Sequence, residues 1–372
     1  MQLEKLLIRN FRNYRETKIE FSPYINLLIG QNAQGKTNLL EAIYLLAFGR
    51  SFRSNNEQDL IRYGCDGFRV EGVFSSRNGV KSTLEYAFGP AGKAILQNGV
   101  ALKRAQDLFG RVNVVLFSPD DLQLLKGGPE HRRTYLDLYL AQTEPRFRRA
   151  FHSYQRALFQ RNELLRRIRE KETDREELLV WNETFLARAL EVIGWRLQAM
   201  RDLAPSIVSY HARLAGGKEE IALSYMFGGK VPLAEEAQAA ELLGRELVSR
   251  EKEEIIRGLT LTGPHRDDIA IGFRAGRALR SFASQGQQRT AALAMKLAAV
   301  DYLTDRLGEP PIVLLDDVLS EFDEERKMAL FRTLLTTVQT LITSTEKKDF
   351  GGVLAAARLF LVEDGQIEEE RQ

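Results

Sequence analysis

One stretch limits the possible folds of this chain more than any other: GQNAQGKTN, from Gly30 to Asn38. It matches the pattern G-x-x-x-x-G-K-[ST], in which backbone N–H groups of a glycine-rich loop surround a chain of phosphates. The preceding INLLI has the composition of a buried strand, and the following NLLEAIYLL has that of a helix. A strand, a phosphate loop and a helix in this order predict an α/β protein that binds a nucleotide.

The residue types of this loop predict its contacts with the nucleotide. We expect the bound nucleotide to touch the whole loop, which consists of Gly30, Gln31, Asn32, Ala33, Gln34, Gly35, Lys36, Thr37 and Asn38. Lys36 would reach the β- and γ-phosphates, and the hydroxyl of Thr37 would coordinate Mg²⁺. The loop therefore predicts a nucleoside triphosphate and Mg²⁺ as cofactors.

A second stretch, IVLLDD, complements the loop. Pro310 and Pro311 can precede a strand but not lie within it, and the apolar residues after them end in Asp316 and Asp317. Ligands of open α/β sheets bind at the carboxyl ends of strands, where these carboxylates would lie. Asp316 would hold Mg²⁺ through water, and Asp317 would orient or deprotonate the attacking water. A helix cap or a solvated turn remains the alternative interpretation.

Composition limits the remaining possibilities. The chain has 372 residues, a formal net charge of +2, and Cys65 as its single cysteine, so no internal disulfide can form. Its four histidines lie far apart in the sequence, without the spacing of metal ligands, and we expect His265 to serve hydrogen bonding in its loop. No apolar run is long enough for a membrane helix, and the N-terminus does not resemble a signal peptide. We expect a soluble cytoplasmic protein with no membrane partner.

The pattern of apolar residues and glycines changes near residue 120. Short apolar runs dominate before it, whereas the following segment is poor in glycine and has helical periodicity. We predict one helix from Pro145 to about Arg169, and a second that begins at Thr173 with a capping box to Glu176. The expected architecture is an α/β head split by a mostly helical arm: residues 1–124 and 257–372 form the head, and residues 125–256 form the arm.

The stretch FASQGQQRT begins a further predicted helix with a polar, glycine-containing cap. Ser284 and Gln287 have the spacing of a capping box. Free N–H groups at such a helix start can bind phosphate. If two copies dock head to tail, Ser284, Gly286 and Gln287 of one copy would cover the γ-phosphate bound by the other. A plain capping box on a surface helix is the alternative.

The order of these motifs is typical of a known family. SQGQQ resembles the Ser-x-Gly-[Gly/Gln]-Gln signature of ABC-type ATPases, and KGGPEHRRTYLD and GPHRDD resemble segments of the RecF family of bacterial DNA-repair ATPases. The resemblance extends from residue 3 to about residue 345. It implies an ABC-type ATPase head, ATP-dependent homodimerisation, DNA binding without sequence preference, and slow DNA-stimulated ATP hydrolysis. It also implies action with RecO and RecR to load recombinase at gaps in DNA replication and repair.

Two features depart from the patterns of related enzymes. The segment after the acidic strand reads SEFD, with Phe322 where RecF-like proteins usually have leucine. ABC enzymes commonly carry glutamate after the strand aspartate and a histidine after the next strand, where this chain has Asp317 and TSTE. A shorter base and no imidazole favour a slow, nucleotide-timed switch over a motor.

The DNA contacts are predicted from arginine clustering. From Pro129 to Arg169 there are ten arginines and four acidic residues, a net charge of +6. Arginine makes bidentate phosphate contacts, which position a protein without reading sequence. The candidates are Arg50 and Arg53 after the phosphate-loop helix, and Arg132, Arg133, Arg146, Arg148 and Arg149 in the arm. An ordinary solvated face is the alternative for the arm arginines.

Two other functional classes remain open at this point. A transport ATPase subunit would share the phosphate loop, but it should lack the arginine-rich helical insertion and normally has the histidine. A structural DNA binder that works without nucleotide would share the arginines, and nucleotide-dependent sedimentation would distinguish it from an ATP-switched protein.

Overall fold

The computed structural model describes residues 1–217, 219–274, 276–334, 338–346, 350 and 357–370. The chain forms two compact units: residues 1–121 with 299–372, and residues 122–298. Within the described residues, no helix has both the length and the apolar character needed to cross a membrane.

The first unit contains a six-stranded sheet in the order β15-β14-β3-β13-β12-β8. Its strands are β3 (Ile25–Ile29), β8 (Val114–Phe117), β12 (Ile312–Asp316), β13 (Thr340–Ser344), β14 (Ala357–Glu363) and β15 (Gln366–Glu370). All neighbours are parallel except β14 and β15, which form an antiparallel hairpin. The central strands β3, β13 and β12 are buried throughout, which explains their continuous apolar runs.

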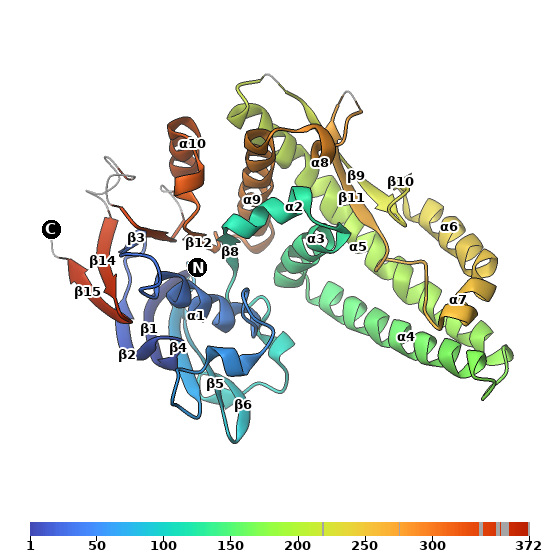
Figure 1. Cartoon of the computed structure of the whole chain (residues 1–372), viewed down its shortest axis with the longest axis horizontal. Coiled ribbons are helices and arrows are strands. Elements are labelled where there is room, and N and C mark those ends of the chain that lie inside the picture. Colours follow the sequence, from blue (N-terminus) through green and yellow to red (C-terminus); the bar gives the residue numbers. More distant parts are fainter. Residues whose placement is uncertain (218, 275, 335–337, 347–349, 351–356, 371–372) are drawn as a thin grey trace. The chain divides into compact units, whose positions relative to one another are not determined.

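A second, antiparallel sheet has the order β2-β1-β4-β5-β6-β7. Its strands are β1 (Gln2–Phe11), β2 (Tyr14–Glu20), β4 (Phe68–Ser75), β5 (Lys81–Gly89), β6 (Gly92–Gln97) and β7 (Val100–Ala101). Helix α1 (Lys36–Phe48) contacts strands of both sheets and is buried along nearly its whole length (Figure 1). It ends at Gly49, whose left-handed φ of 65° closes the helix. Helix α10 (Glu324–Leu334) also belongs to this unit.

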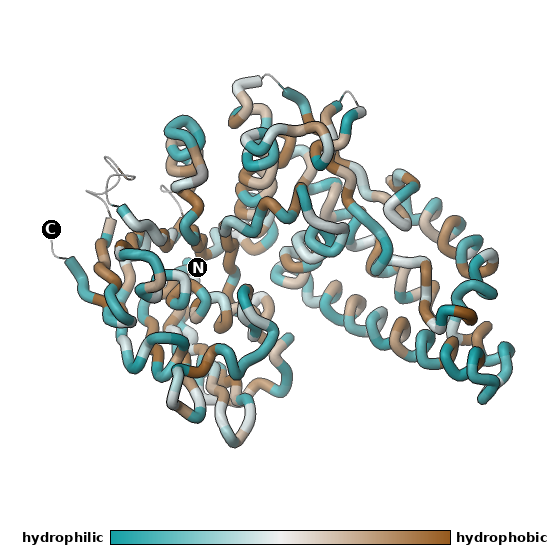
Figure 2. Tube along the Cα trace, in the orientation of Figure 1, coloured by the Kyte–Doolittle hydropathy of each residue, from teal (hydrophilic) through white to brown (hydrophobic). Residues whose placement is uncertain are grey.

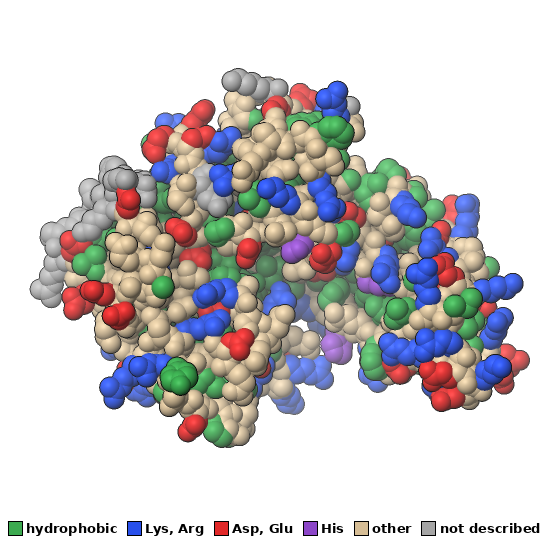
Figure 3. All heavy atoms as spheres, viewed as in Figure 1, with side chains coloured by type: hydrophobic (Ala, Val, Ile, Leu, Met, Phe, Trp, Pro, Cys, Tyr) green, Lys and Arg blue, Asp and Glu red, His purple; other side chains and the backbone are tan. Residues whose placement is uncertain are grey.

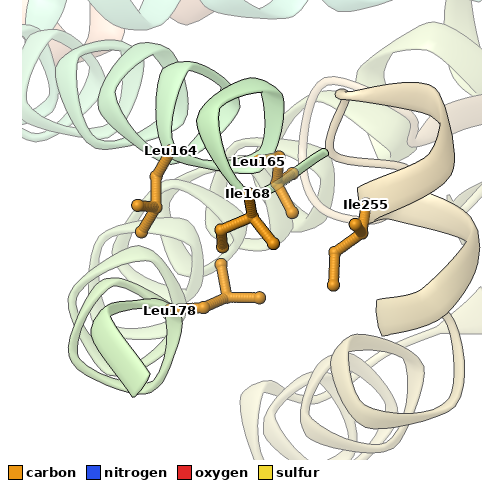
Figure 4. Packing of buried hydrophobic residues seen from close by; sticks show 5 residues of the cluster. All are labelled: Leu164, Leu165, Ile168, Leu178 and Ile255. Atoms are coloured by element: carbon orange, nitrogen blue, oxygen red, sulfur yellow. The ribbon is translucent and has the colours of Figure 1, made fainter. Parts of the chain in front are cut away.

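The second unit is built on long helices. They are α3 (Pro129–Thr143), α4 (Pro145–Arg169) and α5 (Glu176–Leu214), preceded by the short α2 (Gln123–Lys126). Helices α4 and α5 pack along each other, and apolar and polar residues alternate along both of them (Figure 2). At the turn between them, Leu164, Leu165, Ile168 and Leu178 form a buried cluster with Ile255 of α7 (Glu251–Arg257) (Figure 4).

A three-stranded sheet and the start of a further helix complete this unit. The remaining elements are β9 (Ile221–Phe227), β10 (Val231–Leu233), α6 (Glu236–Ser249), α7 (Glu251–Arg257), β11 (Asp268–Phe273), α8 (Leu279–Phe282) and α9 (Gln285–Leu307). Both β10 and β11 pair antiparallel with β9. Helix α9 begins in this unit and ends in the first one.

Several predicted boundaries are confirmed, and others are wrong. Helix α4 spans the predicted residues, whereas α5 starts at Glu176 and not at Thr173. The Thr173 hydroxyl donates to the Glu177 carboxylate, so the predicted capping box with Glu176 does not form. The stretch before the C-terminus forms a hairpin of β14 and β15.

The compact units differ from the predicted domains at the second boundary. Residues 257–298 belong to the second unit, because β11 pairs with β9 and α8 contacts β11. The predicted division into a head of residues 1–124 and 257–372 and an arm of residues 125–256 remains a prediction.

Candidate functional site

The phosphate loop connects β3 to α1. Gly35 has a φ of +117°, and Ala33 has a φ of +67°, so the loop turns through backbone conformations that glycine adopts most easily. Gly30 is needed for a different reason. A Cβ atom at this position would lie 2.2 Å from the carbonyl oxygen of Val362 in β14. Any side chain at position 30 would therefore block the path by which the loop leaves the sheet.

Lys36 is held inside the loop. Its Nζ atom donates to the carbonyl oxygens of Gly30 and Gln31, each at 2.7 Å. Burial lowers the pKa of Lys36, while the carboxylates of Asp317 and Asp316 act in the opposite direction. The ammonium group thus has a defined position within the loop, at the place where phosphate oxygens are bound in loops of this type.

The acidic strand reaches the same place from the other end of the chain. Strands β3, β13 and β12 are parallel neighbours, so their carboxyl ends meet at one edge of the sheet. The hydroxyl of Thr37 donates to Oδ1 of Asp316 at 2.8 Å, and the hydroxyl of Thr343 donates to the same atom at 3.0 Å. Burial raises the pKa of Asp316, and these two hydrogen bonds oppose the rise.

Asp317 lies beside this cluster in an uncommon backbone conformation. Its φ is +51°, and its N–H donates to the Thr343 hydroxyl at 2.9 Å. Asp317, Lys36 and Thr37 line a pocket of about 330 Å³, whose other lining residues are Asn32, Ala33, Gly35, Asn38, Arg53 and Thr343. The structure thus brings the predicted loop residues and both predicted aspartates together.

Thr343 is a site residue that the sequence patterns did not indicate. In the sequence, the TSTE stretch stands out only because it lacks a histidine. Thr343 becomes recognisable in the structure, because it bonds both aspartates and is almost fully buried at the end of β13. A hydroxyl residue at the end of a strand next to the acidic strand is the signal that could have found it.

The loop also has an outer wall that the sequence did not predict. The Asn13 amide donates to the carbonyl of Gln34 and accepts from the amide of Asn38, at 2.9 and 2.8 Å. The Gln34 side chain accepts from the N–H of Asp364 at 2.6 Å, and the hydroxyl of Tyr14 donates to the carbonyl of Gly35. The turns β1–β2 and β14–β15 therefore brace the phosphate loop from outside.

Of the two candidate arginines after α1, Arg53 joins the pocket and Arg50 is exposed. The Arg53 guanidinium donates to the Asn38 amide at 2.8 Å and lies 3.7 Å from the buried carboxylate of Glu41. Glu41 also receives two hydrogen bonds from Arg12. A line of polar contacts thus runs from the surface at Arg53 to the phosphate loop.

The second unit contains the predicted cap at the start of α9, which we call the signature cap (residues 284–288). The predicted capping box is present: the N–H of Gln287 donates to the Ser284 hydroxyl at 3.3 Å, and the N–H of Ser284 donates to Oε1 of Gln287 at 2.5 Å. Ser284 is exposed, and Gly286 and Gln287 are half-buried. The helix therefore begins where the sequence placed it.

The arm arginines fall into two groups. Arg132 is buried and forms a bidentate ion pair with Asp268 at 2.7 and 2.9 Å, and Arg133 donates to the carbonyl of Asp267. These two arginines hold α3 against β11 and the loop before it. Arg132 is buried in its ion pair, which contradicts its predicted contact with DNA, and we correct that prediction; Arg133 is half-buried and its DNA contact remains a prediction. Arg146 and Arg149 are exposed at the start of α4, whereas Arg148 is half-buried and donates to the carbonyl of Ala141.

Lys and Arg side chains gather on the visible face of the second unit, at the far end of α4 (Figure 3). Three exposed arginines, Arg166, Arg167 and Arg169, lie in the last turn of α4. Arg161 has a different role, because it is fully buried and donates to Glu254, Asn182 and Thr260. Helix α4 thus carries a set of solvent-exposed arginines and one buried arginine that bonds to neighbouring elements.

The GPHRDD segment is a structural junction of the second unit. The buried guanidinium of Arg196 pairs with Asp137 and donates to the carbonyl of Pro264. The hydroxyl of Tyr225 donates to Asp267 at 2.7 Å. His265 hydrogen-bonds with the hydroxyl of Tyr154 at 2.6 Å, which confirms its predicted role in holding its loop.

Known proteins resemble this chain over its whole length. The model of the RecF/RecN/SMC N-terminal domain family matches residues 2–368. The DNA replication and repair protein RecF of Halalkalibacterium halodurans is 36% identical over 100% of both chains. The RecF protein of Staphylococcus carnosus is 38% identical over 99% of this chain and 100% of its own.

Solved structures agree with the sequence comparison. The recombination mediator protein RecF-ATP of the RecFOR pathway superimposes with a TM-score of 0.91 at 33% identity, over 99% of this chain and 97% of that one. The RecF-ATPrS structure gives a TM-score of 0.90 at 33% identity, over 100% of this chain and 98% of that one. An Smc head bound to the C-terminal winged-helix domain of ScpA shares the fold, with a TM-score of 0.58 at 15% identity over 100% of this chain and 97% of that one.

The fold is thus that of an ABC-type ATPase head with an inserted, mostly helical arm, as the sequence predicted. The similarity to RecF proteins over the whole chain also decides against the transport ATPase alternative. By its family match and by its identity to full-length relatives, the chain belongs to the RecF/RecN/SMC N-terminal domain family and, within it, to the RecF proteins of DNA replication and repair.

Proposed function

We propose that this protein is an ATP-switched DNA-binding protein that dimerises head to tail on ATP and hydrolyses the ATP slowly. It would act in the cytoplasm, where its DNA substrate lies, and with RecO and RecR it would load recombinase at gaps. The observation that carries the proposal is the hydrogen bond of 2.8 Å between Thr37 and Asp316, beside Lys36 and Asp317. The RecF-ATP structure of the RecFOR pathway supports the choice of ATP and of these partners.

The residues present suit ATP with Mg²⁺. Magnesium prefers oxygen ligands, keeps several waters, and commonly takes only one or two protein groups beside the phosphates. Thr37 and Asp316 provide a hydroxyl and a carboxylate whose oxygens already lie together. Bound Mg²⁺ would neutralise charge on the β- and γ-phosphates, and Asp316 would hold it from the sheet side, directly or through water.

Asp317 is the candidate for activating the attacking water. It lines the pocket, and the hydrogen bond from its N–H to Thr343 fixes its backbone. A carboxylate within reach of a water at the γ-phosphate can orient it or take its proton. Aspartate is one methylene shorter than glutamate, and Thr343 offers a hydroxyl rather than an imidazole. Both features favour slow turnover.

The signature cap would complete the nucleotide site of a second copy. The first turn of a helix leaves N–H groups without internal partners, and these groups favour an anion. In the capping box the Ser284 oxygen accepts from the N–H of Gln287, so its own proton stays available to a phosphate oxygen. We therefore assign Ser284, Gly286 and Gln287 to the γ-phosphate held by the partner.

DNA would contact the exposed arginines. Arg146 and Arg149 lie one turn apart on the exposed side of α4, and Arg148 supports this turn through its bond to Ala141. Arg50 and Arg53 are a second set, and Arg53 is the one that touches the phosphate loop through Asn38. A DNA phosphate that binds Arg53 would compete for that hydrogen bond, which gives a route from DNA binding to ATP hydrolysis.

The test is a sizing experiment with ATP, ADP or no nucleotide, each with and without gapped duplex DNA. The expected result is a dimer that forms only with ATP. This dimer should hydrolyse its ATP faster when DNA is present. DNA binding of equal strength without nucleotide, combined with a monomer under every condition, would favour the nucleotide-independent DNA binder instead.

A further inference from the structure

The side chain of Gln287 in the signature cap is held at both ends. Its Oε1 atom accepts from the N–H of Ser284 at 2.5 Å, as the capping box requires. Its Nε2 atom donates to Oε1 of Glu219, which lies 68 residues earlier, in the loop between α5 and β9. The end of α5 and the start of α9 lie side by side in Figure 1, in agreement with this bond.

The chemistry of the two groups makes this contact directional. An amide carries an acceptor at one end and a donor at the other, whereas a carboxylate can only accept. Glu219 therefore requires the NH₂ group of Gln287 to face it, which turns the Gln287 oxygen toward Ser284. The reversed amide would place two donors against each other at Ser284 and would break the capping box.

The backbone on both sides of Glu219 is bonded to neighbouring elements. On one side, the N–H of Gly217 donates to the carbonyl of Ala212 in the last turn of α5 at 2.8 Å. On the other side, the N–H of Arg274 at the end of β11 donates to the carbonyl of Glu220 at 2.8 Å. The loop thus holds Glu219 between the arm helix α5 and the small sheet.

We infer that Glu219 is a positioning residue: it fixes the Gln287 amide so that Ser284 and the first turn of α9 are ready to receive the partner's γ-phosphate. The inference rests on the proposed head-to-tail dimer. Because Glu219 closely follows α5, it also ties the signature cap to the longest helix of the arm. Movement of the arm on DNA would then change the cap through this contact.

The experiment compares Glu219→Ala with Glu219→Gln and with the neighbouring Glu220→Ala. Glu220 is the matched control, because it is an adjacent exposed carboxylate that pairs with Arg274 instead of the cap. Glu219→Ala should raise the protein concentration at which half of the ATP-bound protein is dimeric about fivefold, since it removes a hydrogen bond to a charged group. Glu219→Gln keeps an acceptor oxygen and should stay within about twofold of the wild type.

Two further measurements separate positioning from general damage. The affinity of each monomer for a fluorescent ATP analogue should not change in any of the variants, since the phosphate loop is intact. The thermal midpoint of Glu219→Ala should match that of Glu220→Ala. A defect of dimerisation that glutamine rescues, at unchanged ATP affinity and stability, is the result expected of a positioning residue.

Ser284→Arg is included to distinguish this inference from the proposed dimer. If Ser284→Arg blocks ATP-dependent dimerisation but Glu219→Ala dimerises like Glu220→Ala, the role of Glu219 is refuted and the dimer stands. If Ser284→Arg dimerises normally, the proposed dimer itself is refuted. Tighter dimerisation of Glu219→Ala would also overturn the inference, because Glu219 would then restrain the cap instead of preparing it.

Discussion

The hydroxyl of Thr37 donates a hydrogen bond of 2.8 Å to the carboxylate of Asp316, although the two residues are 279 positions apart in the chain. This hydrogen bond exists because β3 and β12 are both parallel neighbours of β13, so that their carboxyl ends meet at one edge of the sheet. It joins the two halves of the proposed nucleotide site, and the first two predictions follow from it.

Lys36→Met should abolish ATP-dependent dimerisation. The β- and γ-phosphates would lose their point charge, and nucleotide binding should weaken on the order of thirtyfold or more. Lys18→Met is the control, because Lys18 is exposed on β2 and lies outside the pocket lining. Fluorescence titration and sizing measure the two effects. Normal ATP-dependent dimerisation of Lys36→Met would refute the assignment of the loop.

Asp317→Asn should still bind ATP and should accumulate as a dimer. The change removes the base but leaves Thr37 and Asp316 in place, so hydrolysis should fall about 100-fold while the dimer lives longer. Phosphate release and the decay of the dimer after ATP removal are the measurements. Hydrolysis at the wild-type rate would mean that another group activates the water.

Neutralising Arg146, Arg148 and Arg149 together should weaken duplex binding equally for all sequences. The plot of log affinity against log salt should become shallower by about 0.9 for each DNA phosphate that the variant no longer binds. Because Arg148 also donates to Ala141, the double variant Arg146→Ala/Arg149→Ala isolates the exposed pair. An unchanged slope in the double variant would identify this face as merely solvated.

Arg132→Met provides the contrasting control for that experiment. It would leave Asp268 partly buried without its ion partner, which should cost about 3 kcal/mol of stability. The salt slope of the protein that remains folded should stay at the wild-type value. Urea unfolding and DNA titration at several salt concentrations therefore separate internal arginines from surface arginines.

Ser284→Arg should block dimerisation while each monomer still binds ATP. The added bulk and positive charge would lie where the partner's γ-phosphate and Mg²⁺ must fit. Mixing Ser284→Arg with Lys36→Met creates one site with both defects and one intact site. ATP-dependent association, with up to half of the normal sites, should then return if one site is enough to hold the pair.

If mixing restores nothing, a crosslink decides between the remaining explanations. Cysteines placed near Asn38 and Gln287, with Cys65 removed, should crosslink two otherwise wild-type copies only when ATP is present. No ATP-dependent intermolecular crosslink would rule out the head-to-tail arrangement. A crosslink without rescue on mixing would mean that both sites are required.

The stability of the protein should fall as the pH is lowered from about 6.5 to about 4 through the titration of His265. Burial lowers the pKa of His265 to about 4 from its ordinary value of 6.5. As the pH falls, the unfolded chain therefore binds this proton first. The free energy of unfolding decreases by about 3 kcal/mol, most of it between pH 6.5 and pH 4.

The check is urea unfolding of the wild type and of His265→Asn at a series of pH values. His152→Asn is the control, since His152 is exposed on α4. The pH dependence should become weaker in His265→Asn and stay unchanged in His152→Asn. Equal pH dependence in all three proteins would contradict the assignment to His265.

Features that depend on neighbours in the chain were predictable from the sequence. The phosphate loop, the acidic strand, the limits of α4 and the capping box of Ser284 and Gln287 all follow from local patterns of glycine, proline, apolar spacing and cap residues. The same patterns gave a wrong prediction at Thr173. Its spacing to Glu176 is that of a capping box, but its hydroxyl donates to the carboxylate of Glu177 instead.

Only the tertiary structure decided which chemically identical residues face solvent and which distant residues meet. Arg132, Arg149 and Arg161 look alike in the sequence, yet the first and last are buried in ion pairs and Arg149 is exposed. Thr343 meets Asp316 because their strands are neighbours in a parallel sheet, and Glu219 meets Gln287 because the end of a long helix lies beside the start of α9. Such interactions depend on the packing of elements far apart in the chain, and no local pattern of residues encodes them.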